Sequence, residues 1–130
     1  MIPPLKQILV VEDEPDLQTV IKLVLEQMGG FIVETCNSGE EAIKKAPAFN
    51  PDLILLDMLM PGMDGLTTYQ ALRCIPLTAS IPIIFLTAMI QPEEIKRYKE
   101  LGAIEVIYKP FNPLTLCSTI SQIWSQYHHV

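Results

Sequence analysis

Five short apolar runs rich in β-branched residues constrain the fold of this 130-residue chain more than any other feature. They recur at intervals of roughly 20 to 30 residues, which is room for one strand, one helix and the loops between them. The third and fourth runs show little alternation of apolar and polar residues, as is typical of parallel strands covered on both faces. The predicted strands span residues 8–11, 31–33, 53–56, 83–86 and 104–108.

The segments between these runs have the periodicity of helices. An apolar stripe at helical spacing runs through residues 17–28, and Pro15 suits the first turn of that helix. Ser38 followed by Glu41 has the spacing of a capping box, so we expect a second helix to begin there, with Pro47 in the loop after it. The other predicted helices span residues 66–74, 92–101 and 113 onward.

Length and composition narrow the classes of function. A chain of 130 residues is predicted to form a single domain, residues 1–130. Nine basic against 15 acidic side chains give a net charge of −6, the wrong sign for direct binding of nucleic acid or of an anionic membrane. Cys36, Cys74 and Cys117 lack the spacing of a disulfide framework or a zinc site. Because we find neither an export leader nor an apolar stretch of the roughly 20 residues that cross a bilayer, we expect a cytoplasmic protein.

Polar side chains with useful chemistry follow four of the five predicted strands. In an open parallel sheet, ligands bind outside the carboxyl ends of the strands. Glu12 and Asp13 follow the first strand, Asp57 the third, Thr87 the fourth and Lys109 the fifth. No charged residue follows the second strand, as expected if the strand order is 2-1-3-4-5 and the second strand lies at the edge, away from the site.

Each of these residues taken singly could be a helix cap, a loop hydroxyl or a solvated charge. Together, three neighbouring carboxylates and one ammonium leave a charge of about −2, which favours a divalent cation. Mg²⁺ is usually held by carboxylate and phosphate oxygens of this kind. A carboxylate such as Asp57 can accept a phosphoryl group when a cation, the ammonium of Lys109 and the hydroxyl of Thr87 neutralise its oxygens. The Pro- and Gly-containing segment 57–65 lets the backbone approach that group closely.

Five short motifs occur in a fixed order along nearly the whole chain: VVEDEP at 10–15, LLDMLMPGMDG at 55–65, LTA at 86–88, LGA at 101–103 and KPF at 109–111. Any one of them is a weak signal, but the ordered set is specific. It resembles the response-regulator receiver domain, the phosphoacceptor module of two-component signalling. The resemblance implies a flavodoxin-like (βα)5 fold, a three-layer sandwich around a five-stranded parallel sheet of order 2-1-3-4-5.

The resemblance also implies a role for each residue of the acidic cluster. Asp57 is the expected site of phosphorylation. Asp13, Asp57 and the backbone carbonyl of Leu59 are the expected Mg²⁺ ligands, and Glu12 is expected to act chiefly through a metal-bound water. The cofactor implied is therefore Mg²⁺.

On the other side of the site, the resemblance implies that Thr87 and Lys109 contact the phosphoryl group. The bond between Lys109 and Pro110 can be cis, because this isomer is accessible at modest cost only before proline. One position departs from the family pattern: Val106 stands where many members carry an aromatic switch residue. Tyr108 points by strand alternation to the same face, one step nearer the site, and we expect it to have a packing role.

We therefore expect a phosphorylation switch, and at most an enzyme that catalyses its own phosphorylation and dephosphorylation. The expected donor is a sensor histidine kinase or a phosphotransfer protein, and the output is contact with an unknown protein target or onward phosphotransfer. We expect no output domain after the last predicted helix, and therefore a stand-alone receiver of the chemotaxis-regulator type, which binds neither nucleic acid nor membrane directly.

Three alternatives belong to other classes. A phosphatase or phosphotransferase of the haloacid-dehalogenase type would also use Asp57 as nucleophile, but such enzymes carry a second acid two residues later, where this chain has Leu59. An interaction module that is never phosphorylated would need a broken site, and none of the five positions is missing. A receiver excised from a hybrid kinase remains open.

Overall fold

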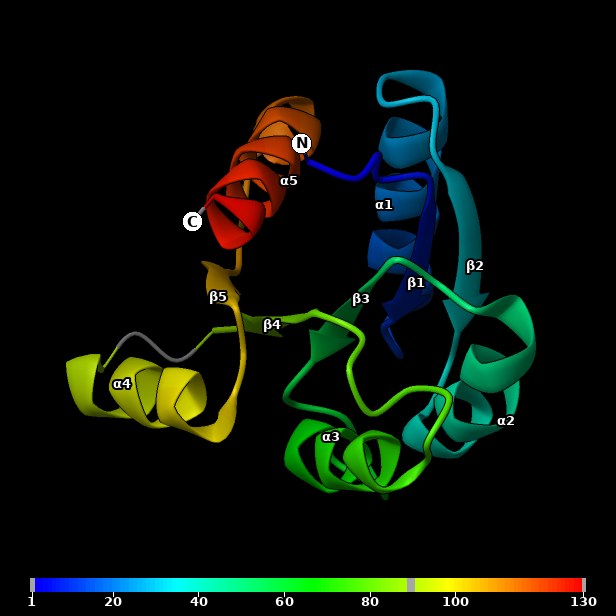
Figure 1. The fold of residues 1–130 in the computed structure, drawn as a ribbon. Coiled ribbons are helices and arrows are strands. Elements are labelled where there is room, and N and C mark those ends of the chain that lie inside the picture. The colour runs from blue at the N-terminus through cyan, green and yellow to red at the C-terminus, as the bar shows by residue number, and fades with distance from the viewer. Residues whose placement is uncertain (1, 89–90, 130) are drawn as a thin grey trace.

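The computed structural model describes residues 2–88 and 91–129, in which strands and helices alternate along the chain (Figure 1). All the strands pair in parallel in the order β2-β1-β3-β4-β5, which confirms the predicted α/β class and strand order. The strands are β1 (Gln7–Val11), β2 (Ile32–Cys36), β3 (Leu53–Asp57), β4 (Ile83–Thr87) and β5 (Glu105–Tyr108). The helices are α1 (Pro15–Gln27), α2 (Gly39–Phe49), α3 (Gly65–Cys74), α4 (Pro92–Leu101) and α5 (Pro113–His128).

Helices cover both faces of the sheet, which makes the molecule a three-layer sandwich. Helices α1 and α5 lie on one side, and α2, α3 and α4 lie on the other (Figure 1). Alternate residues of each strand supply the two cores: Leu9 packs toward α2 and α3, whereas Ile8 packs toward α1 and α5. Every residue of β3 and β4 is buried, which explains why their sequences are apolar without alternation.

Helix α2 differs from its predicted extent. Its start is as expected, since the Ser38 hydroxyl accepts a hydrogen bond from the Glu41 amide at 3.1 Å. The helix continues through Pro47, which the sequence placed in a loop, and ends at Phe49. Proline removes a single backbone donor in the last turn, and the left-handed Asn50 then ends the helix by donating to the Ala46 carbonyl.

Helix α4 is anchored more weakly than the other helices. It spans the predicted residues, but Tyr98 is its single buried side chain. By comparison, α5 buries Leu116, Ile120, Ile123 and Trp124. Elements with few buried apolar contacts open at low free-energy cost, so α4 is the helix whose position can be altered most easily.

Candidate functional site

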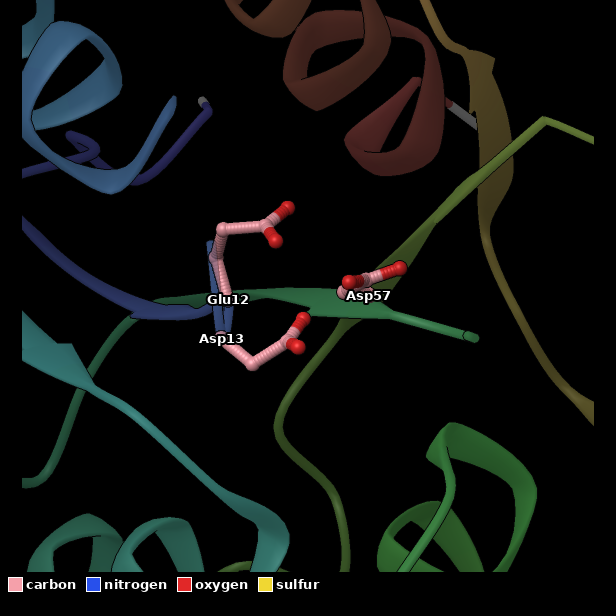
Figure 2. A group of neighbouring side chains, drawn as sticks. All are labelled: Glu12, Asp13 and Asp57. Atoms are coloured by element: carbon pink, nitrogen blue, oxygen red, sulfur yellow. The ribbon is translucent and has the colours of Figure 1, made fainter. Parts of the chain in front are cut away.

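The residues predicted from the strand ends lie together at the carboxyl edge of the sheet. Glu12 and Asp13 follow β1, and Asp57 is the last residue of β3, which pairs with β1. Figure 2 shows the three side chains converging on one space, and one carboxylate oxygen from each lies within 4.8 Å of the others. The strand order places these two strand ends side by side, although the residues are far apart in the sequence.

Lys109, which follows β5, supplies the positive charge among these carboxylates. Its Nζ lies 2.7 Å from Glu12 Oε1 and 3.2 Å from Asp57 Oδ2. Burial acts to lower the pKa of Lys109, but the hydrogen bonds and charges of Glu12 and Asp57 outweigh burial and raise it. Lys109 is therefore an ammonium shared by two carboxylates, and the bond to Pro110 that follows it is cis, as expected.

Glu12 is the most deeply buried carboxylate of the cluster. Its side chain is fully buried, with one oxygen paired to Lys109 and the other accepting the Glu14 amide at 3.1 Å. Burial raises the pKa of Glu12 to about 7; the hydrogen bonds from Lys109 and Glu14 oppose this rise, and the charge of Asp57 adds to it. The raised pKa of Glu12 thus reflects chiefly its burial, with a smaller contribution from the neighbouring Asp57.

The side chain of Asp57 is held by the loop that follows it. Its Oδ1 accepts the Leu59 amide at 3.0 Å, and its Oδ2 faces Lys109. Met58 and Met60 point into the core, whereas the Leu59 side chain is exposed. This alternation keeps the backbone of Leu59 close to the Asp57 carboxylate.

The donor set of this site fits a small divalent cation. Carboxylate oxygens are the ligands that Mg²⁺ prefers, and they come from three residues within 4.8 Å of one another. When ionised they carry three negative charges against the one positive charge of Lys109, so a divalent cation would bring the site close to neutrality.

Thr87 lies beside this cluster, at the end of β4. It is fully buried, and its carbonyl accepts the Lys109 amide at 2.9 Å, which ties the ends of β4 and β5 together. Tyr108 is the register partner of Thr87, but its side chain is 40% exposed, so the packing role expected for it is wrong. The smaller Val106 is buried on the same face instead, opposite Phe85.

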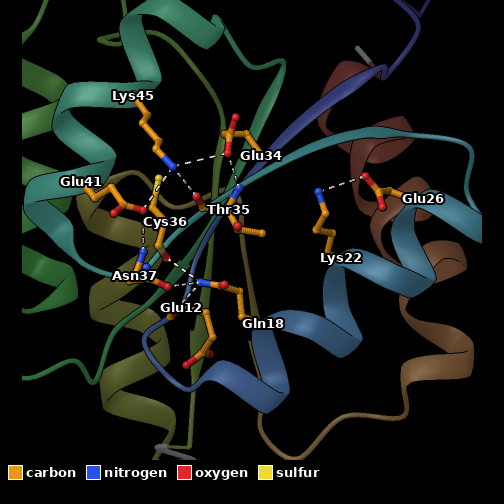
Figure 3. Close-up of polar contacts among 10 residues, drawn as sticks. All are labelled: Glu12, Gln18, Lys22, Glu26, Glu34, Thr35, Cys36, Asn37, Glu41 and Lys45. Carbon is orange, nitrogen blue, oxygen red and sulfur yellow. Dashed lines mark hydrogen bonds and ion pairs between the residues drawn. The ribbon is translucent and has the colours of Figure 1, made fainter.

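Gln18 also supports the site, although no motif in the sequence points to it. From α1, its side-chain amide donates to the backbone carbonyls of Glu12 (2.9 Å) and Cys36 (3.1 Å) and to Asn37 Oδ1 (2.9 Å) (Figure 3). These contacts hold the end of β1 against the end of β2. The available signal was a glutamine beside Leu17 at the edge of the apolar stripe, where an amide can turn toward the strand ends.

Gly65 permits helix α3 to begin directly against the end of β3. A Cβ at this position would lie 2.5 Å from Met58 Cα and 2.6 Å from the Asp57 carbonyl oxygen. Both are backbone atoms, so a larger residue would displace either the helix start or the strand end. The carboxylate of Asp64 caps the same helix by accepting the Thr67 amide at 2.9 Å.

Comparison with known proteins finds the family described as the response regulator receiver domain, which matches residues 8–121. The chain is 39% identical over 118 residues to the alkaline phosphatase synthesis transcriptional regulatory protein PhoP of Bacillus subtilis, covering 91% of this chain and 48% of that protein. It is 37% identical over 118 residues to the phosphate regulon transcriptional regulatory protein PhoB of Escherichia coli, covering 91% and 51%. The chain therefore spans about half the length of the curated relatives it matches.

Solved structures show the same fold. The chemotaxis protein CheY4 of Vibrio cholerae superimposes with a TM-score of 0.83 at 33% identity, covering 92% of this chain and 99% of that one. The signal receiver domain of a signal transduction histidine kinase from Syntrophus aciditrophicus does so with a TM-score of 0.79 at 34% identity, covering 96% and 94%. In the described part of this chain, no helix has the length and apolar character needed to span a bilayer.

Gly65→Ala tests the close contact between α3 and the end of β3. We expect the free energy of unfolding to fall by about 1 to 3 kcal/mol, because the added methyl group meets backbone atoms. We also expect any increase in stability caused by Mg²⁺ to shrink, because the Asp57 backbone must shift. Chemical denaturation with and without Mg²⁺ measures both effects.

Gly30→Ala is the matched control for this variant. Gly30 has a φ of 69° in open space, so alanine there strains the backbone far from the site. We expect it to lose stability and keep the full Mg²⁺ effect. Retention of that effect in Gly65→Ala as well would show that the close contact does not position Asp57.

Proposed function

Because this chain belongs to the response regulator receiver domain family, we propose that Asp57 accepts a phosphoryl group from a phosphohistidine of a sensor kinase or a phosphotransfer protein. The observation that carries the proposal is the position of the Asp57 carboxylate. It is buried at a strand end, with an ammonium on one oxygen, an amide on the other and two further carboxylates beside it. The phosphorylated domain would signal by protein contact or pass the group onward.

The transfer forms one bond and breaks one. An oxygen lone pair of Asp57 attacks phosphorus, the bond from phosphorus to the imidazole nitrogen breaks, and that electron pair stays on the imidazole. The product on this chain is an acyl phosphate. Lys109, already 3.2 Å from Asp57 Oδ2, would pair with a phosphoryl oxygen, and the hydroxyl of Thr87 would donate to another.

The residues that would hold Mg²⁺ are Asp13, Asp57 and the backbone carbonyl of Leu59, with Glu12 nearby. When bound, the ion supplies positive charge to the phosphoryl oxygens during transfer. The charge of the cluster supports this assignment, because Lys109 pairs with Glu12 and Asp57 and a third carboxylate, Asp13, lies beside them.

The same site would serve as a switch and not as an enzyme acting on other substrates. Leu59 occupies the position two residues after Asp57, so no acid stands there to protonate a leaving group. Any catalysis would be confined to phosphorylation and dephosphorylation of this chain. Its free thiols are consistent with action in a reducing compartment such as the cytoplasm.

Phosphorylation of Asp57 can be tested by mass. We expect incubation with Mg²⁺ and a small acyl-phosphate donor to add one phosphoryl group, seen by intact-mass measurement. Asp57→Asn should abolish the gain, whereas Asp64→Asn should not, because asparagine also caps a helix. The proposal fails if no phosphoryl group is gained, or if the gain survives in Asp57→Asn.

Binding of Mg²⁺ should raise the unfolding temperature with concentration. A ligand at 100 times its dissociation constant stabilises the folded state by about 2.7 kcal/mol. We expect Asp13→Ala to lose this increment and Asp16→Ala to keep it, since Asp16 is an exposed acid of the same helix start, outside the cluster. An unfolding temperature of the wild type that does not respond to Mg²⁺ would contradict the metal assignment.

Lys109→Arg tests whether the site needs a compact cation. We expect the rate of phosphorylation to fall by about 100-fold, because a planar guanidinium does not reproduce a point charge seated between two carboxylates. Lys45→Arg is the control, since Lys45 pairs with the partly exposed Glu34 and Glu41. Full activity of Lys109→Arg would show that this residue supplies only general positive potential.

A further inference from the structure

Two tyrosines make the most deeply buried contacts of helix α4, beside the half-buried Ile95 and an ion pair of Lys99 with Glu105 at 2.9 Å. The other side chains of α4 are exposed or half-buried, and Tyr98 is its one buried residue. Tyr69 on α3 holds the end of the same helix, because its hydroxyl donates to the Leu101 carbonyl at 2.6 Å. Helices α3 and α4 lie on the same side of the sheet (Figure 1).

Both tyrosines pack edge-on against one phenylalanine of the central sheet. The ring of Tyr98 lies 5.1 Å from that of Phe85 at an interplanar angle of 74°, and Tyr69 lies 5.2 Å from Phe85 at 81°. Phe85 is fully buried in β4. Each such edge-to-face pair contributes about 0.5 to 1.5 kcal/mol beyond the burial of its area, and only over a narrow range of geometry.

This aromatic stack (Tyr69, Phe85 and Tyr98) is continuous with the candidate site. Phe85 precedes Thr87 by two residues, so the two side chains leave β4 on the same face. Its register partner on β3 is Leu56, the residue before Asp57. A displacement of the end of β4 toward an occupied site is therefore transmitted to the Phe85 ring.

Tyr98 is also within electrostatic reach of the loop that follows Asp57. Its pKa is raised chiefly by burial; Glu94 raises it further, Arg97 opposes the rise, and Asp64 adds to it. Asp64 caps α3 immediately after that loop. Tyr98 thus contacts β4 through the ring of Phe85, and the charge of Asp64 at the start of α3 acts on its hydroxyl.

Strand β5 does not supply an equivalent contact. Val106, the register partner of Phe85, is a small aliphatic side chain, and Tyr108 is 40% exposed. An aromatic ring packed edge-on has few alternative arrangements, whereas valine can be accommodated as the strand shifts. In the described part of the chain, both ring contacts of Phe85 come from helices, and one of them comes from α4 itself.

We propose that Tyr98 is the positioning residue through which the phosphorylation state of Asp57 controls the docking of helix α4, by way of its edge-on contact with Phe85. The proposal rests on the proposed function of Asp57. A shift of Phe85 weakens or re-forms the contact of the one fully buried side chain of α4, so the helix exchanges between two discrete dockings. Tyr69 sets the pivot of this motion at Leu101.

Hydrogen exchange of the full chain with and without phosphorylation tests this coupling. With Mg²⁺ and a small acyl-phosphate donor, we expect the exchange rates of amides in α4 to change by about fivefold or more in the wild type. Tyr98→Phe keeps the ring and should retain the change. Tyr98→Met fills most of the same space without a flat ring, and should be phosphorylated at the wild-type rate while α4 no longer responds.

Tyr108→Leu is the matched control, because it removes the exposed tyrosine next to Thr87 and leaves the stack intact. We expect its α4 response to be that of the wild type. Loss of the response in Tyr108→Leu, or a full response in Tyr98→Met, would overturn the proposal. Failure of the wild type to become phosphorylated would instead overturn the proposed function, so the two failures are distinct.

Tyr69→Phe provides a second test that does not disturb packing. It keeps the ring and removes only the hydroxyl, which donates to the Leu101 carbonyl and accepts the Arg73 Nε–H at 3.4 Å, so the sheet amides should keep their protection. We expect the phosphorylation response of the last turn of α4 to shrink while that of the first turn persists. If Tyr98→Met loses amide protection throughout the sheet, Tyr69→Phe provides the test in its place. An unchanged phosphorylation response along the whole of α4 in Tyr69→Phe would contradict the coupling.

Discussion

The ammonium of the half-buried Lys109, shared between the buried carboxylates of Glu12 and Asp57, is the contact on which the rest of the site depends. Lys109 follows the edge strand β5, whereas Glu12 follows β1 and Asp57 ends β3, so the Lys109 side chain reaches past the end of β4 to join them. Removing one partner of a buried ion pair costs about 3 to 5 kcal/mol, because it leaves a charge without compensation. The five-stranded order is what makes this contact possible.

The apolar layers hold the like charges together. Every residue of β3 and β4 is buried between two layers of helices, so the strand ends cannot move apart without opening the core. The free energy gained by packing these apolar layers therefore offsets the electrostatic repulsion among Glu12, Asp13 and Asp57. The raised pKa of Glu12 shows that some repulsion and desolvation remain, and a bound cation or phosphoryl group would change this balance.

Helix α4 departs from this rigid arrangement. It carries charge on most of its surface and buries a single side chain, Tyr98, whereas α5 is seated by four buried side chains. A switch needs one helix or strand that can move at a low free-energy cost. The central strands and the other helices are too deeply packed to move in this way. This weak docking follows from the sequence of α4, which predicts a clear helix but supplies few apolar side chains to pack against the core.

Sequence by itself determined the strands, the fold class and the membership of the site. Apolar runs and strand-end chemistry are local properties, and the position of Asp57, Thr87 and Lys109 at parallel strand ends follows from them. The helix-ending rule failed for Pro47, because a missing backbone hydrogen-bond donor costs little in the last turn of a helix. Strand alternation failed for Tyr108, because it predicts the face on which a side chain lies but not which residues surround it. Gln18 and the rings around Phe85 were decided only by tertiary structure. Their roles depend on distances between helices and strands that are set by how both apolar layers pack, and no segment of the chain encodes those distances alone.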